Sequence, residues 1–444
     1  MSGIALGYGS PDEAKVKRML EKAAHRGEAM AGRFTENNVV MMQNYLRADT
    51  GGADGGIDVP VAAAGSPARI CYDGQMGNAP DLGTDLGVEP GPLYEERIIL
   101  ELYRKYGHDM FDKLGDAIFG LAISDGTNLL IGRDLLGIKT LFYGRDNGTT
   151  YVATELKSLL EATSDVNEFP PGHFMDETGE LHAFAELPEA PQSDSGKDVD
   201  AIIADIRGII QKSIDNHLDF TRPTASLLSG GLDSSVIASL VAPKYREATG
   251  RNLMTFAVGV GGESGDTRNA RIMADALGTD HHEYLVTMED VVRVLPEVIY
   301  YLESFDPSLV RSAVANFLIS GHAREHGVEV LLSGEGGDEI FCGYAYLKEF
   351  DKEELRKRQV ECLHFLHNNA SLRLDRMNAC HGIRVVAPLI SGELLNYALG
   401  IPPEYKQKPE DDGKKVEKWI FRKAFEKELV PEITWRLKQE FSEG

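Results

Sequence analysis

Cysteine is scarce in this 444-residue sequence, and the few copies form no pattern. The four cysteines are Cys71, Cys342, Cys362 and Cys380, with no CxxC pair among them. This spacing argues against a disulfide scaffold and against a cysteine zinc site. We therefore expect reduced thiols and a cytoplasmic protein.

Long apolar runs are also missing. No stretch approaches the ~20 consecutive apolar residues that cross a bilayer. The first residues, Met1 to Leu6, lack the basic region of a signal peptide. The sequence therefore predicts neither secretion nor insertion into a membrane.

Basic residues are outnumbered by acidic ones. Lysine and arginine total 46 against 70 aspartates and glutamates, which gives a formal net charge of −24. Such an excess of negative charge repels nucleic-acid phosphates and anionic lipids. We expect small-molecule partners, and neither a nucleic acid nor a membrane.

Length and one break in composition predict two domains. The chain is longer than the roughly 100–200 residues of a typical domain. Apolar patterning stops between Leu187 and Asp198, where proline, serine and glycine gather. We expect domains over residues 1–187 and 198–444.

The two halves differ in their secondary-structure patterns. The first half contains short β-like runs between turn signals, at residues 118–123, 128–131 and 141–143. They predict a β-rich layered domain. In the second half, isoleucines recur at helical spacing from Ile202 to Ile214, and helical patterns then alternate with short apolar strands at residues 225–228, 254–258, 283–286 and 328–332. That alternation predicts an α/β domain with a mainly parallel sheet.

Two of these strands run into glycine-rich loops. One loop is the sequence Ser-Gly-Gly-Leu-Asp-Ser-Ser at residues 229–235, and the other is Ser-Gly-Glu-Gly-Gly-Asp-Glu at residues 333–339. Because ligands of open α/β sheets bind outside the carboxyl ends of the strands, we expect both loops to border one crevice. In the first loop, glycine N–H groups, serine hydroxyls and the start of a helix could cradle a phosphate.

The first loop is not a Walker A loop, because it lacks the lysine of GxxxxGK[ST]. The charge of a bound phosphate must then be offset by a metal ion or by a distant basic residue. Asp233 and Asp338, one from each loop, could hold Mg²⁺, which binds carboxylate and phosphate oxygens together. Either loop taken alone could equally be a simple strand-to-helix turn.

Both loops, together with Gly-Thr-Asp-His-His-Glu at residues 278–283, resemble asparagine synthetase. The similarity covers nearly the whole chain, because segments at residues 132–139, 154–157 and 170–173 resemble the N-terminal domain of that family. The resemblance implies an N-terminal α-β-β-α domain of the Ntn-hydrolase type and a C-terminal pyrophosphate-loop domain with a doubly wound parallel sheet. β-Lactam synthetases and other amide ligases share this architecture, and a homodimer is one assembly it allows.

The resemblance also implies a reaction. Family members transfer AMP from ATP to a carboxylic acid, release pyrophosphate, and pass the acyl group to an amine. By resemblance, pyrophosphate contacts Ser229, Gly230, Gly231, Ser234 and Ser235. The adenosine contacts Leu227, Val258, Ser333 and Gly334, and Asp233 and Asp338 bind Mg²⁺.

Two further residues match catalytic positions of the family. Glu335 could orient or deprotonate the amine, although it could instead cap its loop or pair with a nearby cation. Lys438 matches a lysine that stabilises the phosphate and the transition state, although a lysine near a chain end is often simply solvated.

The glutaminase motifs of the family are altered. Ser2 stands where the family has its nucleophilic cysteine, and hydroxyls are much weaker nucleophiles than thiolates near neutral pH. Asp73-Gly74 replaces Asn-Gly, and residues 25–28, His-Arg-Gly-Glu, depart from the usual Arg-Gly-Pro. We expect that glutamine hydrolysis is lost, so that nitrogen comes from ammonia, from a separate glutaminase or from an organic amine.

The acid substrate is a second point of departure. The family segment Glu-x-Arg-Val-Pro-Phe-Leu-Asp is replaced by Arg-Val-Val-Ala-Pro-Leu-Ile-Ser at residues 384–391, which changes three charged positions. Aspartate itself, a more anionic acid, or the acid of a β-lactam-synthetase-like enzyme all remain open, and the segment could also serve packing alone. The sequence also leaves open a tRNA-modifying pyrophosphate-loop enzyme and a non-catalytic descendant of the family.

Overall fold

The computed structural model describes residues 2–27, 29–46, 60–62, 66–189, 196–218, 220–260, 265–410 and 414–436. The chain forms two compact units. The first unit comprises Met1–Glu186 together with Ala379–Arg384, and the second comprises Leu187–Asn378 together with Val385–Gly444. Each unit is described separately below.

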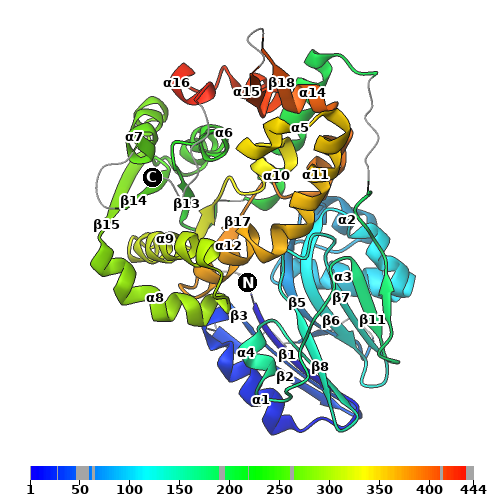
Figure 1. The fold of residues 1–444 in the computed structure, drawn as a ribbon. Helices are drawn as coiled ribbons and strands as arrows, with labels where there is room; N and C mark the ends of the chain where they lie inside the picture. The colour runs from blue at the N-terminus through cyan, green and yellow to red at the C-terminus, as the bar shows by residue number, and fades with distance from the viewer. Residues whose placement is uncertain are drawn as a thin grey trace. The chain divides into compact units, whose positions relative to one another are not determined.

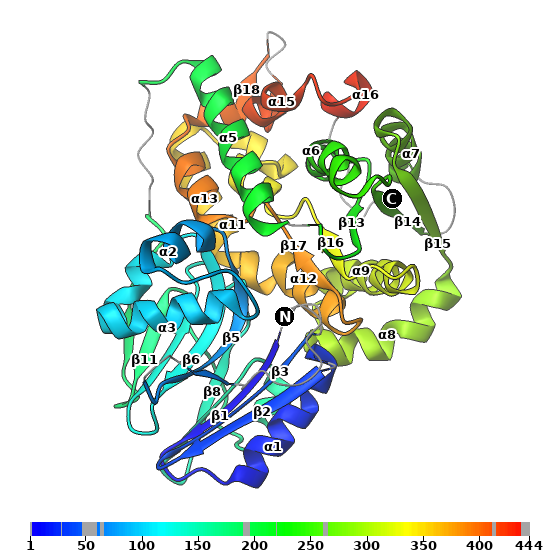
Figure 2. The same cartoon turned by 180° about the vertical axis from the view of Figure 1, so that it is seen from behind.

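The first unit contains two six-stranded sheets (Figures 1 and 2). One sheet has the strand order β10 (Asn167–Glu168), β8 (Phe142–Asp146), β9 (Thr149–Ala153), β1 (Ser2–Tyr8), β3 (Val39–Tyr45) and β2 (Ala29–Glu36). The other has the order β12 (Leu181–Ala183), β11 (His173–Asp176), β7 (Leu129–Arg133), β6 (Ala117–Ser124), β5 (Arg69–Met76) and β4 (Val61–Ala62). The helices are α1 (Glu13–Lys22), α2 (Ala79–Leu86), α3 (Tyr94–Tyr106) and α4 (Leu156–Leu159), with short 3-10 helices at Ala24–Arg26 and Gly107–Lys113.

Alternation along β1 explains the layers of this unit. Ile4 and Leu6 belong to a core that also takes residues from β5, β6 and β7 of the other sheet. Ala5, between them, belongs to a different core that includes Val16 and Met19 of α1. Because successive side chains of a strand point to opposite faces, one face of this sheet meets the other sheet and its second face meets α1. The α-β-β-α arrangement expected for the first half is thus confirmed.

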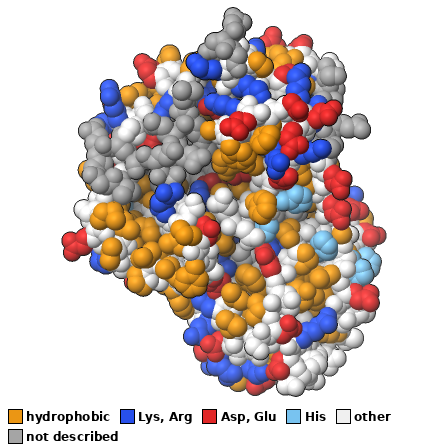
Figure 3. Space-filling view, viewed as in Figure 1, with side chains coloured by type: hydrophobic (Ala, Val, Ile, Leu, Met, Phe, Trp, Pro, Cys, Tyr) orange, Lys and Arg blue, Asp and Glu red, His pale blue; other side chains and the backbone are white. Residues whose placement is uncertain are grey.

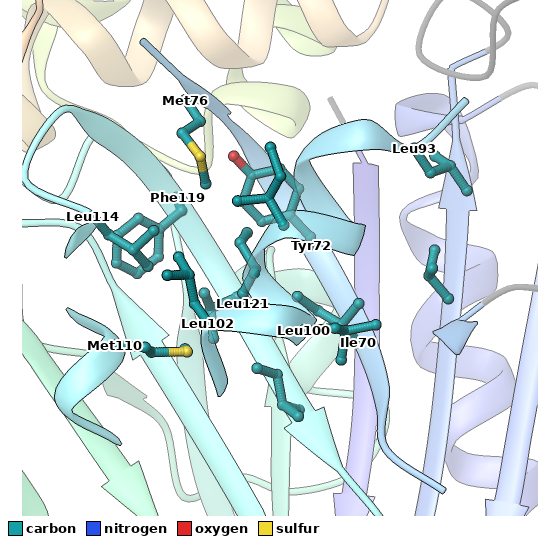
Figure 4. Close-up of a cluster of buried hydrophobic side chains, with 14 of the residues drawn as sticks. Ile70, Tyr72, Met76, Leu93, Leu100, Leu102, Met110, Leu114, Phe119 and Leu121 are labelled. Atoms are coloured by element: carbon teal, nitrogen blue, oxygen red, sulfur yellow. The ribbon is translucent and has the colours of Figure 1, made fainter. Parts of the chain in front are cut away.

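The other sheet of the first unit packs against α3 (Figure 4). Ile70, Tyr72, Phe119 and Leu121 project from β5 and β6 toward Leu100 and Leu102 of α3, and Met110 and Leu114 close one side. These side chains are at most 4% exposed. Burying a large apolar side chain contributes roughly 1.5–3 kcal/mol, so this cluster is a principal source of stability in the unit.

The second unit is built on a five-stranded sheet in the order β15 (Asp280–Val286), β14 (Met254–Val260), β13 (Thr224–Leu227), β16 (Val330–Leu332) and β17 (Arg384–Val386). The pairs β13–β14, β13–β16 and β14–β15 are parallel. A two-stranded antiparallel sheet, β18 (Gln407–Pro409) with β19 (Lys415–Glu417), lies outside it. The parallel sheet predicted for the second half is confirmed.

Helices lie on both faces of this sheet (Figures 1 and 2). The helices of the unit are α5 (Val199–His217), α6 (Leu232–Thr249), α7 (Gly265–Leu277), α8 (Met288–Leu302), α9 (Pro307–Glu325), α10 (Gly337–Phe341), α11 (Lys352–Phe365), α12 (Ala370–Ala379), α13 (Gly392–Leu399), α14 (Pro403–Lys406), α15 (Trp419–Phe425) and α16 (Pro431–Thr434). Helices α6 and α7 cover one face and α9 covers the other. This is the doubly wound arrangement that the sequence predicts.

The surface mixes charges of both signs. On the face drawn in Figure 3, acidic and basic side chains are interspersed with hydrophobic ones. Exposed pairs such as Arg358 Nη1 with Glu361 Oε2, 2.8 Å apart, contribute little to stability, because water screens both charges. Within the described ranges, no helix combines the length and the apolar character that a bilayer crossing requires.

The cluster in Figure 4 leads to a stability prediction. Phe119 is 1% exposed and stacks on Phe111, with ring centroids 6.0 Å apart. We expect Phe119→Ala to lower the free energy of unfolding of the first unit by about 3–5 kcal/mol, because it leaves a cavity in a packed core. Chemical denaturation would measure this loss, and Leu181→Ala, at a position 38% exposed, is the control. Equal losses in the two variants would contradict the assigned core.

Candidate functional site

The two glycine-rich loops leave neighbouring parallel strands. Strand β13 pairs with β16 in the register Ser226 with Leu332. Strand β16 ends directly before its loop, and β13 ends one residue before its loop. Because parallel neighbours end at the same edge of a sheet, both loops emerge side by side. The common crevice expected from the sequence is therefore present.

Glycines let the two loops touch. A side-chain Cβ at Gly334 would lie 2.5 Å from the backbone nitrogen of Ser234, and a Cβ at Gly337 would lie 2.6 Å from Cγ of Asp233. Both distances are shorter than real Cβ contacts allow. The second loop can approach Asp233 this closely only because it carries glycine at these two positions.

The first loop folds around its serines. The hydroxyls of Ser229 and Ser234 are 3.1 Å apart, and Gly231 N donates to the Ser229 hydroxyl at 3.3 Å. Gly231 then begins α6 without a side-chain cap, so the first N–H groups of this 18-residue helix point at the crevice. A helix start of this kind favours a bound anion.

Asp233 and Asp338 converge on one buried lysine. Lys418 Nζ lies 2.5 Å from Asp233 Oδ2 and 2.7 Å from Asp338 Oδ1, and the Lys418 side chain is only 4% exposed. Burial disfavours the ammonium, but the two carboxylates outweigh it and raise the pKa of Lys418. The lysine is thus a fixed positive charge between the two aspartates.

The backbone at Lys418 has an unusual conformation. Its φ is +54°, in the left-handed region that residues with a side chain rarely occupy. It follows strand β19 directly, and the preceding residue, Glu417, bonds Lys348 Nζ at 2.5 Å and Arg422 Nη2 at 2.6 Å. Strained backbone of this kind persists where neighbours hold it, and it is frequent at functional sites.

A cavity of about 670 Å³ opens beside these residues within the second unit. The predicted site residues that line it are Leu227, Ser229, Gly231, Asp233, Ser234, Ser333, Gly334, Glu335 and Asp338. Gly230, Ser235 and Val258 are not among the lining residues, and Ser235 is fully buried. Lys438 falls outside the described residues.

Four arginines that sequence reasoning missed also line the cavity: Arg311, Arg373, Arg422 and Arg436. Arg436 donates to the Gly230 carbonyl at 3.2 Å and pairs with Asp266 at 2.5 Å, which fixes the residues directly after α16 against the first loop. With Lys418, these side chains give the cavity several cations for anionic ligands.

One nitrogen of Arg373 holds both carboxylate oxygens of Glu335. Arg373 Nη2 lies 3.0 Å from Glu335 Oε1 and 3.1 Å from Oε2. Pairing with a nearby cation, one of the roles that the sequence allows for Glu335, is therefore observed. The carboxylate nevertheless lines the cavity, so Arg373 also fixes its orientation toward a ligand.

The changed segment at residues 384–391 lies against the second loop. Ser333 N donates to the Val386 carbonyl at 2.9 Å, and a Cβ at Gly336 would lie 2.7 Å from Ile390. None of these eight residues is among those that line the cavity. The segment therefore supports the loop through packing, which is one of the roles that the sequence allows.

Two altered positions of the first unit, Ser2 and Asp73, belong to a buried ionic network. Asp73 accepts from Ser2 N at 3.0 Å and from Arg26 Nη2 at 2.9 Å, and Lys139 Nζ lies 3.3 Å from its Oδ1. Arg26 also bonds Glu155 at 3.2 Å. The side chains of Arg26, Asp73 and Glu155 are at most 1% exposed, so this network is closed to water.

Comparison with known proteins gives consistent results for both units. The model of the asparagine synthase family matches residues 205–360 and 351–444, and that of a glutamine amidotransferase domain matches residues 1–182. Glutamine-hydrolysing asparagine synthetase 2 of Lotus japonicus is 32% identical over all of this chain and 78% of its own length. Its counterpart in Triphysaria versicolor is 30% identical with the same coverage.

Solved structures resemble the chain more distantly. A glutamine phosphoribosylpyrophosphate amidotransferase from B. subtilis covers 77% of this chain at 14% identity, with a TM-score of 0.35. An ammonia-dependent NAD synthetase from Campylobacter jejuni covers 38% at 17% identity, with a TM-score of 0.22.

A titratable carboxyl at the end of the second loop gives a pH prediction. Burial raises the pKa of Glu339 to about 7, with Asp338 and Glu335 adding to the rise. Its partner is the Tyr344 hydroxyl, 2.5 Å away. Because the folded protein keeps this proton after the unfolded chain has lost it, stability should fall as the pH rises from about 4.5 to about 7.

Glu339→Gln should remove this pH dependence, since the amide cannot ionise and its oxygen still accepts from Tyr344. We expect the variant to be more stable than the wild type at pH 8, by about 3 kcal/mol, and equally stable near pH 4. Urea unfolding of both proteins across this range is the measurement. A constant difference at all pH values would contradict the raised pKa.

Proposed function

The chain belongs to the asparagine synthetase family and is a carbon–nitrogen ligase of the AMP-forming class; we propose that its second unit adenylates a carboxylic acid with ATP and passes the acyl group to ammonia or another amine. The observation that carries this proposal is the meeting of Asp233, Asp338 and Lys418 at the mouth of the phosphate loop. We further propose that the first unit does not hydrolyse glutamine.

The two aspartates fit a magnesium site. Carboxylates from two separate loops already share a single cationic partner, Lys418, within 2.7 Å, so both reach a common point. Such hard oxygen donors suit Mg²⁺, and we propose that Asp233 and Asp338 would hold it. When bound, the metal would offset the negative charge of the departing pyrophosphate.

The chain's own residues act on the nucleotide from several sides. N–H groups at the start of α6 and the hydroxyls of Ser229 and Ser234 would receive the pyrophosphate. Lys418 and Arg436 add positive charge beside this loop. Leu227 and Ser333 line the same cavity and would contact the adenosine. Fixed groups of this kind stabilise the charge that develops as the bond to the α-phosphate forms.

We propose that Glu335 orients the incoming amine. Its carboxylate lies in the cavity, and Arg373 Nη2 contacts both of its oxygens. A carboxylate fixed in this way accepts a hydrogen bond from an amine without needing to take up a proton itself. Arg311, which lines the same cavity and is exposed there, would bind an anionic group of the substrates.

The network in the first unit supports the loss of glutamine hydrolysis. In an N-terminal nucleophile enzyme, the nitrogen of the nucleophilic residue is the base that takes the proton. Here that nitrogen belongs to Ser2 and donates to the Asp73 carboxylate at 3.0 Å. Because Met1 precedes Ser2, that nitrogen is a peptide N–H, which donates a hydrogen bond but cannot take up a proton. After removal of Met1, Asp73 beside the new amine would favour its protonated form and so suppress the base.

We expect ATP–pyrophosphate exchange that depends on one carboxylic acid. A panel of acids, with aspartate and more anionic acids included, would be screened with Mg²⁺. Asp233→Asn should reduce the exchange rate at least about 100-fold, because it removes a charge from the phosphate site. Asp215→Asn, an exposed position on α5, is the matched control. Full exchange in Asp233→Asn would reject the assigned site.

Nitrogen transfer gives a second test. With ammonia as the donor we expect amide product, whereas glutamine freed of ammonia should give neither product nor glutamate above background. Ser2→Cys should not create glutaminase activity, because Asp73 still holds the nitrogen of residue 2. Glutamate release by the wild type at the rate of ammonia-dependent synthesis would overturn this part of the proposal.

A further inference from the structure

Lys418 occupies the point at which the two metal-binding carboxylates of the proposed function meet. Its ammonium touches both Asp233 and Asp338. Without a cation between them, two carboxylates this close would repel each other strongly in a partly buried site. The lysine therefore offsets the repulsion between the two carboxylates, as a bound divalent ion would.

We propose that Lys418 is a built-in counter-ion: it holds the two aspartates together in the nucleotide-free protein and opposes binding of a divalent cation until a polyphosphate arrives with it. This inference rests on the proposed function for the identity of the metal ligands. It predicts that metal and nucleotide bind as a pair and that the metal alone binds poorly.

Charge explains the dependence on polyphosphate. Two aspartates and one lysine carry a net charge of −1, and the lysine stands at the centre of the group. A divalent ion entering alone would meet the ammonium at short range, which costs free energy at low effective dielectric. Added phosphate oxygens give the ammonium new partners, so that the lysine can leave a carboxylate without becoming unpaired.

The surroundings keep the lysine in this place. A Cβ at Gly343 would overlap Cε of Lys418 and Oδ1 of Asp338, so only glycine leaves room for the pair. Glu417, one residue earlier, is anchored by Lys348 and Arg422. The left-handed backbone at Lys418, with φ +54°, lies between these contacts, and the Lys418 side chain is buried.

Binding of Mn²⁺ to the full chain, followed by electron paramagnetic resonance, tests the proposal without any acid substrate. For the wild type we expect weak binding of Mn²⁺ alone and much tighter binding once inorganic pyrophosphate is present. Lys418→Met should bind Mn²⁺ alone at least about tenfold more tightly than the wild type. Lys423→Met, a lysine that pairs with Glu426 outside the cavity, should behave as the wild type.

Thermal unfolding adds a readout of stability. In chelator, Lys418→Met should melt below the wild type, and millimolar Mg²⁺ should restore much of the loss, whereas the wild-type Tm should not respond to Mg²⁺ alone. If Lys418→Met fails to fold, the titration of the wild type with Mn²⁺, with and without pyrophosphate, still tests the proposal. Tight Mn²⁺ binding by the wild type without pyrophosphate would overturn the proposal, as would equal Mn²⁺ affinity in Lys418→Met and Lys423→Met.

Failure of this inference can be told apart from failure of the proposed function. The metal titration requires neither adenylation nor a carboxylic acid. Absence of acid-dependent exchange would reject the ligase proposal and leave the counter-ion result standing. Acid-dependent exchange combined with tight metal binding by the wild type alone would reject only the role of Lys418.

Discussion

The ion pairs between Lys418 and the two aspartates are the constraint on which the second unit depends. They join three segments that lie far apart in the sequence: the start of α6, the start of α10 and the turn after β19. The contact requires that β13 and β16 run parallel as neighbours, and that the second loop has no side chains where it passes Asp233. Sheet topology, glycine placement and electrostatics thus converge on one point.

Both units pair their buried charges with charges of opposite sign, but in the second unit such pairs border a cavity. In the second unit, cations and carboxylates line an open cavity, so their charges remain available to a ligand. In the first unit, Arg26, Asp73 and Glu155 satisfy one another in a site closed to solvent. Asp73 differs little in volume from the asparagine of the family motif. Unlike asparagine, it carries a charge, and a charged group in a buried site needs ionic partners. Arg26 and Lys139 supply these partners to Asp73.

Much of this fold could be predicted from the sequence, because the signals are local. Short apolar strands followed by Ser-Gly-Gly and Ser-Gly-Glu-Gly-Gly identify the two loops, and parallel topology requires that they meet. Lys418 could not be found in this way. Its segment, Val-Glu-Lys-Trp-Ile, reads like any amphipathic stretch, and neither its burial nor its positive φ has a signature in one sequence. The partnership of Glu335 with Arg373 depends on the long-range packing of α12, which periodicity does not report.

Arg436 has a consequence for the order in which the site is made. Arg436 donates a hydrogen bond to the carbonyl of Gly230, so the phosphate loop contacts a side chain more than two hundred positions later in the sequence. Strands β13 and β16, which carry the two loops, are therefore synthesised before the cavity gains the charge of Arg436. Until Arg436 has been synthesised, the nascent protein holds the scaffold of a nucleotide site that lacks part of its positive charge.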